Sequence, residues 1–539
     1  MLRLTKPSAK VMLRGDEPHP HRECQVVAGL LSRAPDYPDG GHMERLDQFA
    51  APRLAKADAL FALLLLGVTF ALRLKTLGDT NFFIDDEFYF LVGQRMHDGL
   101  VPYVDIWDRK PLGLFILFYL IAAVSSATWA YQIVAWCFLA ATAWTIHRIV
   151  MTWTNRQGAV FAGIAYLVLT CIFDGVNGQA PVFYNLFVAG AVLLIVRDFP
   201  SLGQGVCSWR VWLAMALLGL GITIKQTVLI EALFLGCFVL WQLRSAGAPL
   251  RKILAQATGF AVIGAAPTLA IAGYYAAAGH WHEFWHAMVT ANLHKQSIGG
   301  LLMTYGLMLI VVEALPISLI VAWAFMSRLL PDKPRHFLLG WLLSALAGFI
   351  VIPNFFNHYV LPVTLPLSVI AGFVFSQNGK GRIAFAAACT WLALWYNPAD
   401  FAYTQRSIAG MNRLAALISA HDGGGGLLVY DGPPYLYALT DKQFLSPLAF
   451  PTHLNHDIER DVSHLKTSDE MDRIIAGRPG VVVIARFPEH YPVNIDSDRK
   501  IRNYINRNCR VVGSARLWTL GDPNDILVFG DCGRSGLRG

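Results

Sequence analysis

The stretch PLGLFILFYLIAAVSSATWAYQIVAWCFLAATAWT, residues 111–145, carries no charged side chain. A membrane helix needs about 20 mainly apolar residues. The run therefore holds either two spans, or one span preceded by a helix that lies at the membrane surface. Because this choice sets the side of the membrane on which every later loop lies, it decides the topology of the chain.

The composition indicates a membrane protein. Of the 539 residues, 55% are hydrophobic and only 15% are charged, whereas soluble domains carry about 25% charged residues. The composition argues against a wholly soluble protein, and it excludes a disordered chain, which would be poor in hydrophobic residues. Eleven segments are predicted as spans, the second of which lies mostly within the stretch 111–145: 57–74, 129–147, 158–173, 181–197, 211–224, 227–243, 253–277, 302–327, 336–352, 359–376 and 382–397.

Positive charge in the loops resolves the topology, because Lys and Arg accumulate in cytoplasmic loops. If 111–126 does not cross and the N-terminus is cytoplasmic, the short outer loops hold only Lys225 and Lys295. The inner loops then hold Arg148, Arg156, Arg197, Arg210, Arg244, Arg251, Lys252, Arg328, Lys333, Arg335, Lys380 and Arg382. Counting 111–126 as a span inverts this bias.

We therefore predict a polytopic α-helical membrane protein. It has about eleven transmembrane helices, and an amphipathic or re-entrant helix at 111–126 on the outer face, in a first outer loop at about 75–128. The net charge of +7 is then explained by topology, and no nucleic-acid partner is expected.

The two ends of the chain differ from the middle. Residues 1–56 are polar and are predicted to be a cytoplasmic, disordered tail without a cleavable signal peptide, in which Met43 is an alternative start. Residues 401–539 are predicted to be a small outer α/β domain, with buried strands at 427–430, 481–484 and 526–529. Its two cysteines, Cys509 and Cys532, are either a disulfide or two separate thiols.

The first outer loop opens with three consecutive carboxylates, Asp85, Asp86 and Glu87. The negative charges of these side chains repel one another. We therefore expect a metal, a nearby cation or an acceptor substrate that gives up a proton to compensate them. The alternative is a solvated acidic turn. Further along lie Tyr103, Asp105, Asp108, Arg109 and Lys110, directly before Pro111.

Pro111 suits the first turn of a helix, which puts Lys110 at a helix N-terminus. A cation is disfavoured there unless an anion such as phosphate is bound. An interfacial belt of basic and aromatic residues is the alternative.

Other unusual polar residues fall on the same predicted face: Asn177 and Gln179 in the second outer turn, Lys225 in the third, and His358 and Tyr359 in the fifth. In the fourth loop His282 and His286 are four apart, a spacing that suits metal ligation on a helix. The neighbouring tryptophans favour an interfacial helix instead. Together these residues predict a site at the bilayer boundary for a lipid-linked phosphate.

The pattern that several of these residues form resembles the sequence pattern of the GT-C membrane glycosyltransferases. Asp86-Glu87 followed by Tyr89, then Pro102-Tyr103, Asp105, Asp108 and Lys110-Pro111, are similar to the bacterial branch of family 39. That branch includes protein mannosyltransferase relatives, aminoarabinose transferases and lipopolysaccharide galacturonosyltransferases. The resemblance covers about residues 57–400, which are then a GT-C catalytic domain. Lys225-Gln226-Thr227 and His358-Tyr359 add weaker support.

The resemblance implies an inverting transferase in a bacterial inner membrane, with its active site on the periplasmic face. The donor is a sugar on a polyprenyl phosphate, and the acceptor is a periplasmic glycan, lipid A or lipopolysaccharide, or a protein. Asp86 is the implied base, assisted by Glu87 or Asp85. Lys110, Arg109 and Lys225 are the implied phosphate-binding residues.

The resemblance also implies a divalent metal ion as a possible cofactor, for which Asp108 and His286 are candidate ligands. The sequence departs from the aminoarabinose transferases at Arg109, where they have Glu, and at Ala180, where they have an acid before the Pro. These departures argue against assuming that sugar.

Two alternative functions remain open. A lipid-linked sugar flippase or transporter would use acids within the spans, and Glu231 and Glu313 are such acids. The alternative is that these two glutamates only pair with side chains of a neighbouring helix. A ligase or polymerase without the Asp-Glu base, or a non-catalytic scaffold, is the third possibility.

Overall fold

The computed structural model describes residues 43–352, 354–488, 491–519 and 522–533. The chain divides into two compact units, residues 1–59 and 60–539. The first helix, α2, begins at Met43, earlier than the span predicted from residue 57, and ends at Arg73. Of the tail predicted for 1–56, residues 43–56 lie in α2 and residues 1–42 lie outside the described residues.

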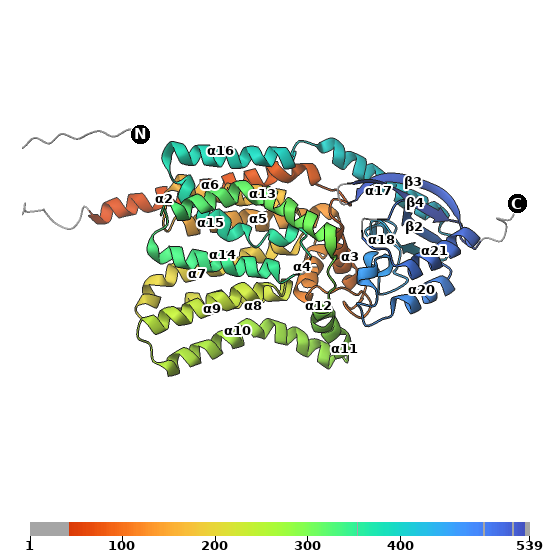
Figure 1. Ribbon diagram of the computed structural model, residues 1–539, viewed down its shortest axis with the longest axis horizontal. Coiled ribbons are helices and arrows are strands. Elements are labelled where there is room, and N and C mark those ends of the chain that lie inside the picture. Colours follow the sequence, from red (N-terminus) through yellow and green to blue (C-terminus); the bar gives the residue numbers. More distant parts are fainter. Residues whose placement is uncertain (1–42, 353, 489–490, 520–521, 534–539) are drawn as a thin grey trace, which may run out of the picture. The chain divides into compact units, whose positions relative to one another are not determined.

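A helix coincides with each of the eleven predicted spans. They are α2 (Met43–Arg73), α5 (Thr128–Val150), α6 (Arg156–Ile172), α7 (Ala180–Gly203), α8 (Trp209–Ile224), α9 (Val228–Ser245), α10 (Leu250–Ala277), α13 (Gly300–Met326), α14 (Asp332–Ile350), α15 (Thr364–Phe375) and α16 (Asn378–Trp395). Among the described residues, six helices are long and apolar enough to cross a membrane: α2 from Asp58 onward, α5, α7, α9, α10 and α13. Helices α6, α8 and α15 are apolar but shorter. Figure 1 shows the long helices running side by side.

The uncharged stretch at 111–126 forms a separate short helix, α4 (Leu112–Ala122). Its 11 residues extend about 17 Å, too short for a hydrocarbon core of about 30 Å. The predicted amphipathic character is wrong, because apolar side chains occupy both the buried positions, such as Phe118, and the exposed ones, such as Leu120. The helix is held by close packing: a Cβ on Gly113 would lie 2.4 Å from the Thr223 hydroxyl of α8.

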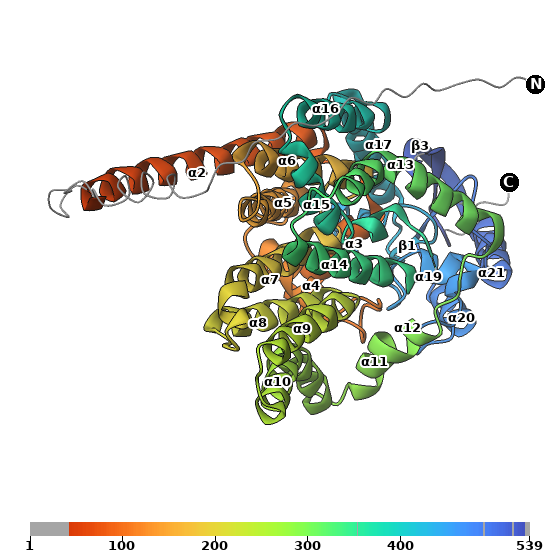
Figure 2. The same cartoon turned by 60° about the vertical axis from the view of Figure 1, so that its left-hand side comes forward.

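Short elements connect the long helices at the loops. They are η1 (Leu74–Thr76), α3 (Ile84–His97), α11 (Trp281–Trp285), η2 (His286–Thr290), α12 (Ala291–Leu293) and η3 (Asn357–Val360). Figure 2 shows the chain leaving α10 through α11 and α12. The acidic run 85–87 lies in the first turn of α3.

The C-terminal region contains a four-stranded sheet of order β1-β2-β4-β3. Its strands are β1 (Leu427–Val429), β2 (Val481–Ala485), β3 (Arg510–Thr519) and β4 (Asp522–Gly530). Strands β1 and β2 are parallel, and β4 runs antiparallel to β2 and β3. The helices and turns of this region are α17 (Phe401–His421), α18 (Leu436–Leu439), α19 (Thr452–Asn455), η4 (Asp457–Glu459), α20 (Thr467–Ala476) and α21 (Ile495–Asn508). The three predicted strands are confirmed, and β3 was missed.

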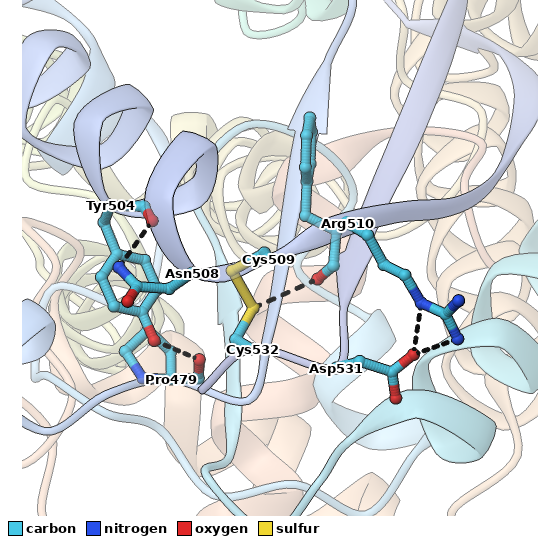
Figure 3. The surroundings of a disulfide bond; sticks show 8 residues. Pro479, Tyr504, Asn508, Cys509, Arg510, Asp531 and Cys532 are labelled. Carbon is cyan, nitrogen blue, oxygen red and sulfur yellow. Dashed lines mark hydrogen bonds and ion pairs between the residues drawn. A yellow bond between two sulfur atoms is a disulfide. The ribbon is translucent and has the colours of Figure 1, made fainter. Parts of the chain in front are cut away.

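A disulfide joins the end of α21 to the end of β4. Cys509 is bonded to Cys532, with 4.1 Å between their Cα atoms (Figure 3). Beside it, Asp531 accepts a hydrogen bond from Arg510 at 2.8 Å. The disulfide alternative for these two cysteines is therefore the one found.

Candidate functional site

Glu87 fixes the start of α3. Its carboxylate accepts hydrogen bonds from the backbone N–H groups of Phe82 at 3.1 Å and Phe83 at 3.2 Å, and from the Tyr131 hydroxyl at 3.1 Å. Burial, and then the charge of Asp79, raise the pKa of Glu87 to about 8. These contacts occupy the carboxylate, so Glu87 shapes the loop around the acidic run.

Asp86 is held against the turn that precedes α7. It is 1% exposed, and its Oδ2 accepts a hydrogen bond from the backbone N–H of Gly178 at 2.8 Å. Its Oδ1 has no hydrogen-bond partner among the described residues. Burial raises the pKa of Asp86 well above its usual range, and the charges of Glu87 and Asp85 add to the rise. A raised pKa makes a carboxylate a stronger base.

Asp85 has the opposite environment. Burial alone would raise its pKa, but the charges of Lys110, His358 and Lys225 outweigh this and lower it. Two adjacent carboxyl groups thus have pKa values displaced in opposite directions. Such a pair is typical of a site that divides charged and proton-accepting roles between two acids.

Lys110 is positioned by its own loop. Its carbonyl accepts a hydrogen bond from the Tyr103 hydroxyl at 2.8 Å, and its backbone N–H donates to Asp108 at 3.1 Å. Tyr103 is fully buried and adopts a left-handed backbone with a φ of 71°. Burial would lower the pKa of Lys110, but Asp108 and Asp85 outweigh it and raise the pKa. Lys110 is therefore a charged cation next to Asp85.

Two more lysines flank one aromatic ring. Lys225 Nζ lies 5.3 Å and Lys295 Nζ 5.4 Å from the centre of the Tyr359 ring. Lys295 also donates a hydrogen bond to the Tyr359 hydroxyl at 3.1 Å.

Burial and the charges of neighbouring Lys and Arg side chains disfavour the protonated forms of these two lysines. They lower the pKa of Lys225 well below its usual value and that of Lys295 to about 7. The pKa of His358 falls to about 3, chiefly by burial. A bound anion would relieve this repulsion.

A pocket opens beside these cations, with about 450 Å³ of empty volume, open solvent included. Its wall comes from the first loop, from α7, α9 and α14, and from the turns before α9 and α15. The lining residues are Lys110, Gln179, Ala180, Pro181, Tyr184, Lys225, Thr227, Glu231, Ala345, Gly348, Ile352, His358, Tyr359 and Pro362.

The second turn contributes Asn177 and Gln179. Asn177 Oδ1 accepts hydrogen bonds from Trp136 at 3.0 Å and from Thr76 at 3.1 Å, which holds the turn in place. Gln179 is 1% exposed and lines the pocket, and its Nε2 has no partner among the described residues. A buried amide donor without a partner points to a ligand or water in the pocket.

Three predicted site residues have other partners. Arg109 forms an ion pair with Glu459 of the C-terminal region at 2.5 Å, and Asp105 accepts a hydrogen bond from the Val101 N–H. His286 lies 3.0 Å from the carbonyl of Val462.

The first loop is also attached to the C-terminal region beside Arg109. The backbone N–H of Trp107 donates to Pro447 at 2.9 Å, and the Trp107 ring packs edge-on against His453.

The donor set does not fit a metal held by protein ligands alone. No three His, Cys, Asp or Glu side chains group as metal ligands in the part of the chain that the structure describes. Of the two predicted ligands, Asp108 is engaged with Lys110 and His286 with Val462.

Sequence reasoning did not single out Lys295 and Glu459 as site residues, and it named Glu231 only as an acid that a transporter would use. Lys295 carried a usable signal, because it is one of two basic residues in the short outer loops. Glu459 lies 350 positions from its partner, and nothing in the sequence indicates that pairing.

Comparison with protein-family models and with curated proteins finds no match. The fold does match solved structures. ArnT from Cupriavidus metallidurans bound to undecaprenyl phosphate superposes with a TM-score of 0.57 at 13% identity, covering 87% of this chain and 97% of that one. Its apo form gives 0.59 at 12% identity, covering 89% and 98%. An apo oligosaccharyltransferase from Archaeoglobus fulgidus gives only 0.41 at 13% identity, over 67% and 58%.

The match to ArnT extends over nearly all of both chains. The chain therefore has the GT-C fold, and the family resemblance noted in the sequence is confirmed at the level of fold. With its apolar helices, it is a multi-pass membrane protein.

Proposed function

We propose that this chain is a membrane glycosyltransferase that moves a sugar from a polyprenyl-phosphate donor to a hydroxyl of a glycan, lipid or protein acceptor. One observation carries the proposal: Asp85, beside Asp86 in α3, faces lysines that line a pocket, Lys110 and Lys225. The fold adds support, since ArnT has been crystallised with undecaprenyl phosphate.

The lysines suit a lipid phosphate as leaving group. Lys110 and Lys225 lower the pKa of Asp85, and Lys225 and Lys295 lie against the Tyr359 ring, so three lysines gather around these two residues. As the bond between the sugar and the phosphate breaks, negative charge develops on the phosphate oxygen. Cations already in place stabilise that charge without reorganising.

Asp86 suits the role of base. The acceptor oxygen attacks the anomeric carbon, the bond from that carbon to the phosphate oxygen breaks, and the phosphate leaves with the electron pair. The acceptor proton passes to Asp86, whose unpaired Oδ1 is available for it. Attack opposite the leaving phosphate inverts the anomeric centre, and no step is assigned to a metal.

The setting of the reaction follows from the predicted topology. We place the chain in a bacterial inner membrane with the pocket on the periplasmic face. Residues 57–400 then form the catalytic domain and 401–539 the periplasmic α/β domain.

A transporter is less well supported, because the acids within the helices have partners. Glu231 accepts a hydrogen bond from Trp341 Nε1 at 2.8 Å, which links α9 to α14. Glu313 accepts one from Asn357 at 3.5 Å. Both contacts match the interpretation of these acids as links between neighbouring elements.

The test is sugar transfer in membranes supplied with lipid-linked sugars. We expect Asp86→Asn and Lys110→Ala to reduce transfer by more than about 100-fold, since each removes a charge needed only as the bond breaks. The matched controls are Asp441→Asn, at an exposed position, and Lys380→Ala, at the exposed start of α16. Full activity of both site variants, with normal folding, would refute the proposal and favour transport.

A further inference from the structure

The inner wall of the pocket is polar although it lies within the helix bundle. Tyr184 of α7 and Thr227 and Glu231 at the start of α9 line it together with apolar Ala345 and Gly348 of α14. Glu231 is 2% exposed and is fixed by the hydrogen bond from Trp341. The bond from Trp341 holds this carboxyl group where it lines the pocket, so an occupant that offers hydrogen-bond donors would suit it.

The chemistry of this wall favours a sugar over a lipid tail. An isoprenoid chain offers no hydrogen bonds, so it would leave the buried amide of Gln179 without a partner. The hydroxyl groups of a sugar satisfy such groups.

The position of Glu231 also suits one sugar. Helix α9 begins at Val228, directly after the turn that carries Lys225, and Glu231 follows three residues later. Glu231 therefore lies about 4.5 Å along the helix axis from that turn.

We propose that the inner wall receives the donor sugar and that Glu231 selects its chemical class. Glu231 accepts hydrogen bonds from hydroxyl or amino groups, so a neutral sugar or an amino sugar is accepted. A uronic acid is rejected, because its carboxylate beside Glu231 must either face a like charge or take up a proton. The inference rests on the proposed function, and it narrows the donor that this function left open.

The test compares two donors that differ in one group. The full-length chain in lipid nanodiscs is titrated with decaprenyl phosphate, with its glucosyl ester and with its glucuronosyl ester, and the dissociation constants are measured by calorimetry. We expect the glucosyl ester to bind at least tenfold more tightly than the glucuronosyl ester. Glu231→Gln should reduce this ratio to about threefold or less, because it removes the acid and keeps the amide oxygen.

Glu313→Gln is the matched control, since Glu313 is also a buried glutamate in a helix but does not line this pocket. It should leave the ratio unchanged. A ratio near one in the unmutated chain overturns the inference without any variant, and so does an unchanged ratio in a folded Glu231→Gln. If decaprenyl phosphate itself does not bind, the proposed function fails. If it binds while the two esters do not differ, only the role of Glu231 fails.

Discussion

The Asp86 carboxylate accepts a hydrogen bond from the backbone N–H of Gly178 at 2.8 Å, across 92 positions of sequence. This contact joins the first turn of α3 to the turn before α7, and it brings Gln179 to the same pocket as Lys110. A glycine suits this close approach. A Cβ on residue 178 would lie 3.0 Å from the Tyr131 ring and 3.1 Å from the Phe118 ring.

We therefore expect Gly178→Ala to move the turn away from Asp86 and to reduce transfer by about tenfold or more, the effect of losing a hydrogen bond to a charged group. Transfer rates and thermal unfolding of the purified protein check this together. Gly379→Ala is the control, because a Cβ there meets nothing within 4 Å. An active Gly178→Ala variant would show that the amide contact does not matter.

The pKa of Glu87, raised to about 8, predicts the pH dependence of stability. Between about pH 4.5 and 8 the folded protein keeps a proton that the unfolded chain has lost, so stability falls as pH rises. Glu87→Gln removes this titration and should flatten the decline in unfolding temperature between pH 5 and 8. Asp79 and Asp86 have raised pKa values too, so part of the slope should remain. Equal slopes in both proteins would contradict the assignment.

Lys295 should matter most at low pH. Its pKa, lowered to about 7, means that in the free protein it carries its charge at pH 6 and has lost it by pH 8.5. Lys295→Ala should therefore reduce kcat/KM for the lipid-linked donor by about tenfold at pH 6 and by about threefold or less at pH 8.5. Comparing variant with parent at each pH cancels the titration of Asp86. Lys295→Arg keeps the charge throughout, so its advantage over Lys295→Ala should be the same at both pH values.

The ion pair of Arg109 and Glu459 is mostly buried, with side chains 14% and 12% exposed. Removing one partner leaves a buried charge unpaired, so Glu459→Ala should destabilise the fold by about 3 kcal/mol. Replacing both residues, as Arg109→Met with Glu459→Leu, should restore much of that loss. A double-mutant cycle of unfolding free energies measures the coupling, and purely additive single effects would show that the pair is energetically silent.

The disulfide predicts a redox-dependent stability. Cys509 and Cys532 are 23 residues apart, and closing a loop of that size in the unfolded chain stabilises the fold by about 3 kcal/mol. The double substitution to Ser, or treatment with reductant, should lower the unfolding temperature of the C-terminal region. An unfolding temperature that reductant does not change would refute this contribution.

Most of the fold could be predicted because it is encoded by local composition. Apolar runs mark the long helices, and loop charge was enough to predict that 111–126 does not cross. Strand β3 was missed for a physical reason. It lies at the edge of the sheet and pairs only with β4, so it does not need the buried apolar run that marks β2. Its Arg510, Gly513 and Ser514 disguise it in the sequence.

The site was harder to predict than the fold, because its distances depend on packing. The sequence marks Lys110, Lys225 and Tyr359 as unusual, yet it does not indicate that Lys295 also lies against the Tyr359 ring. The three acids also looked equivalent. In the folded chain Glu87 binds the backbone at the start of α3, Asp86 binds Gly178, and Asp85 lies near the lysines. Only the folded chain supplies these different surroundings.

The contacts of Trp107 and Arg109 with Pro447, His453 and Glu459 bear on how this protein can be divided and recombined. Lys110 directly follows Arg109, so these contacts with residues 447–459 hold the segment that carries this lysine. A truncated bundle would lose that anchor, and a chimera with a foreign C-terminal region would have to supply a matching one. The first loop and residues 447–459 should therefore be kept together when this protein is truncated or recombined.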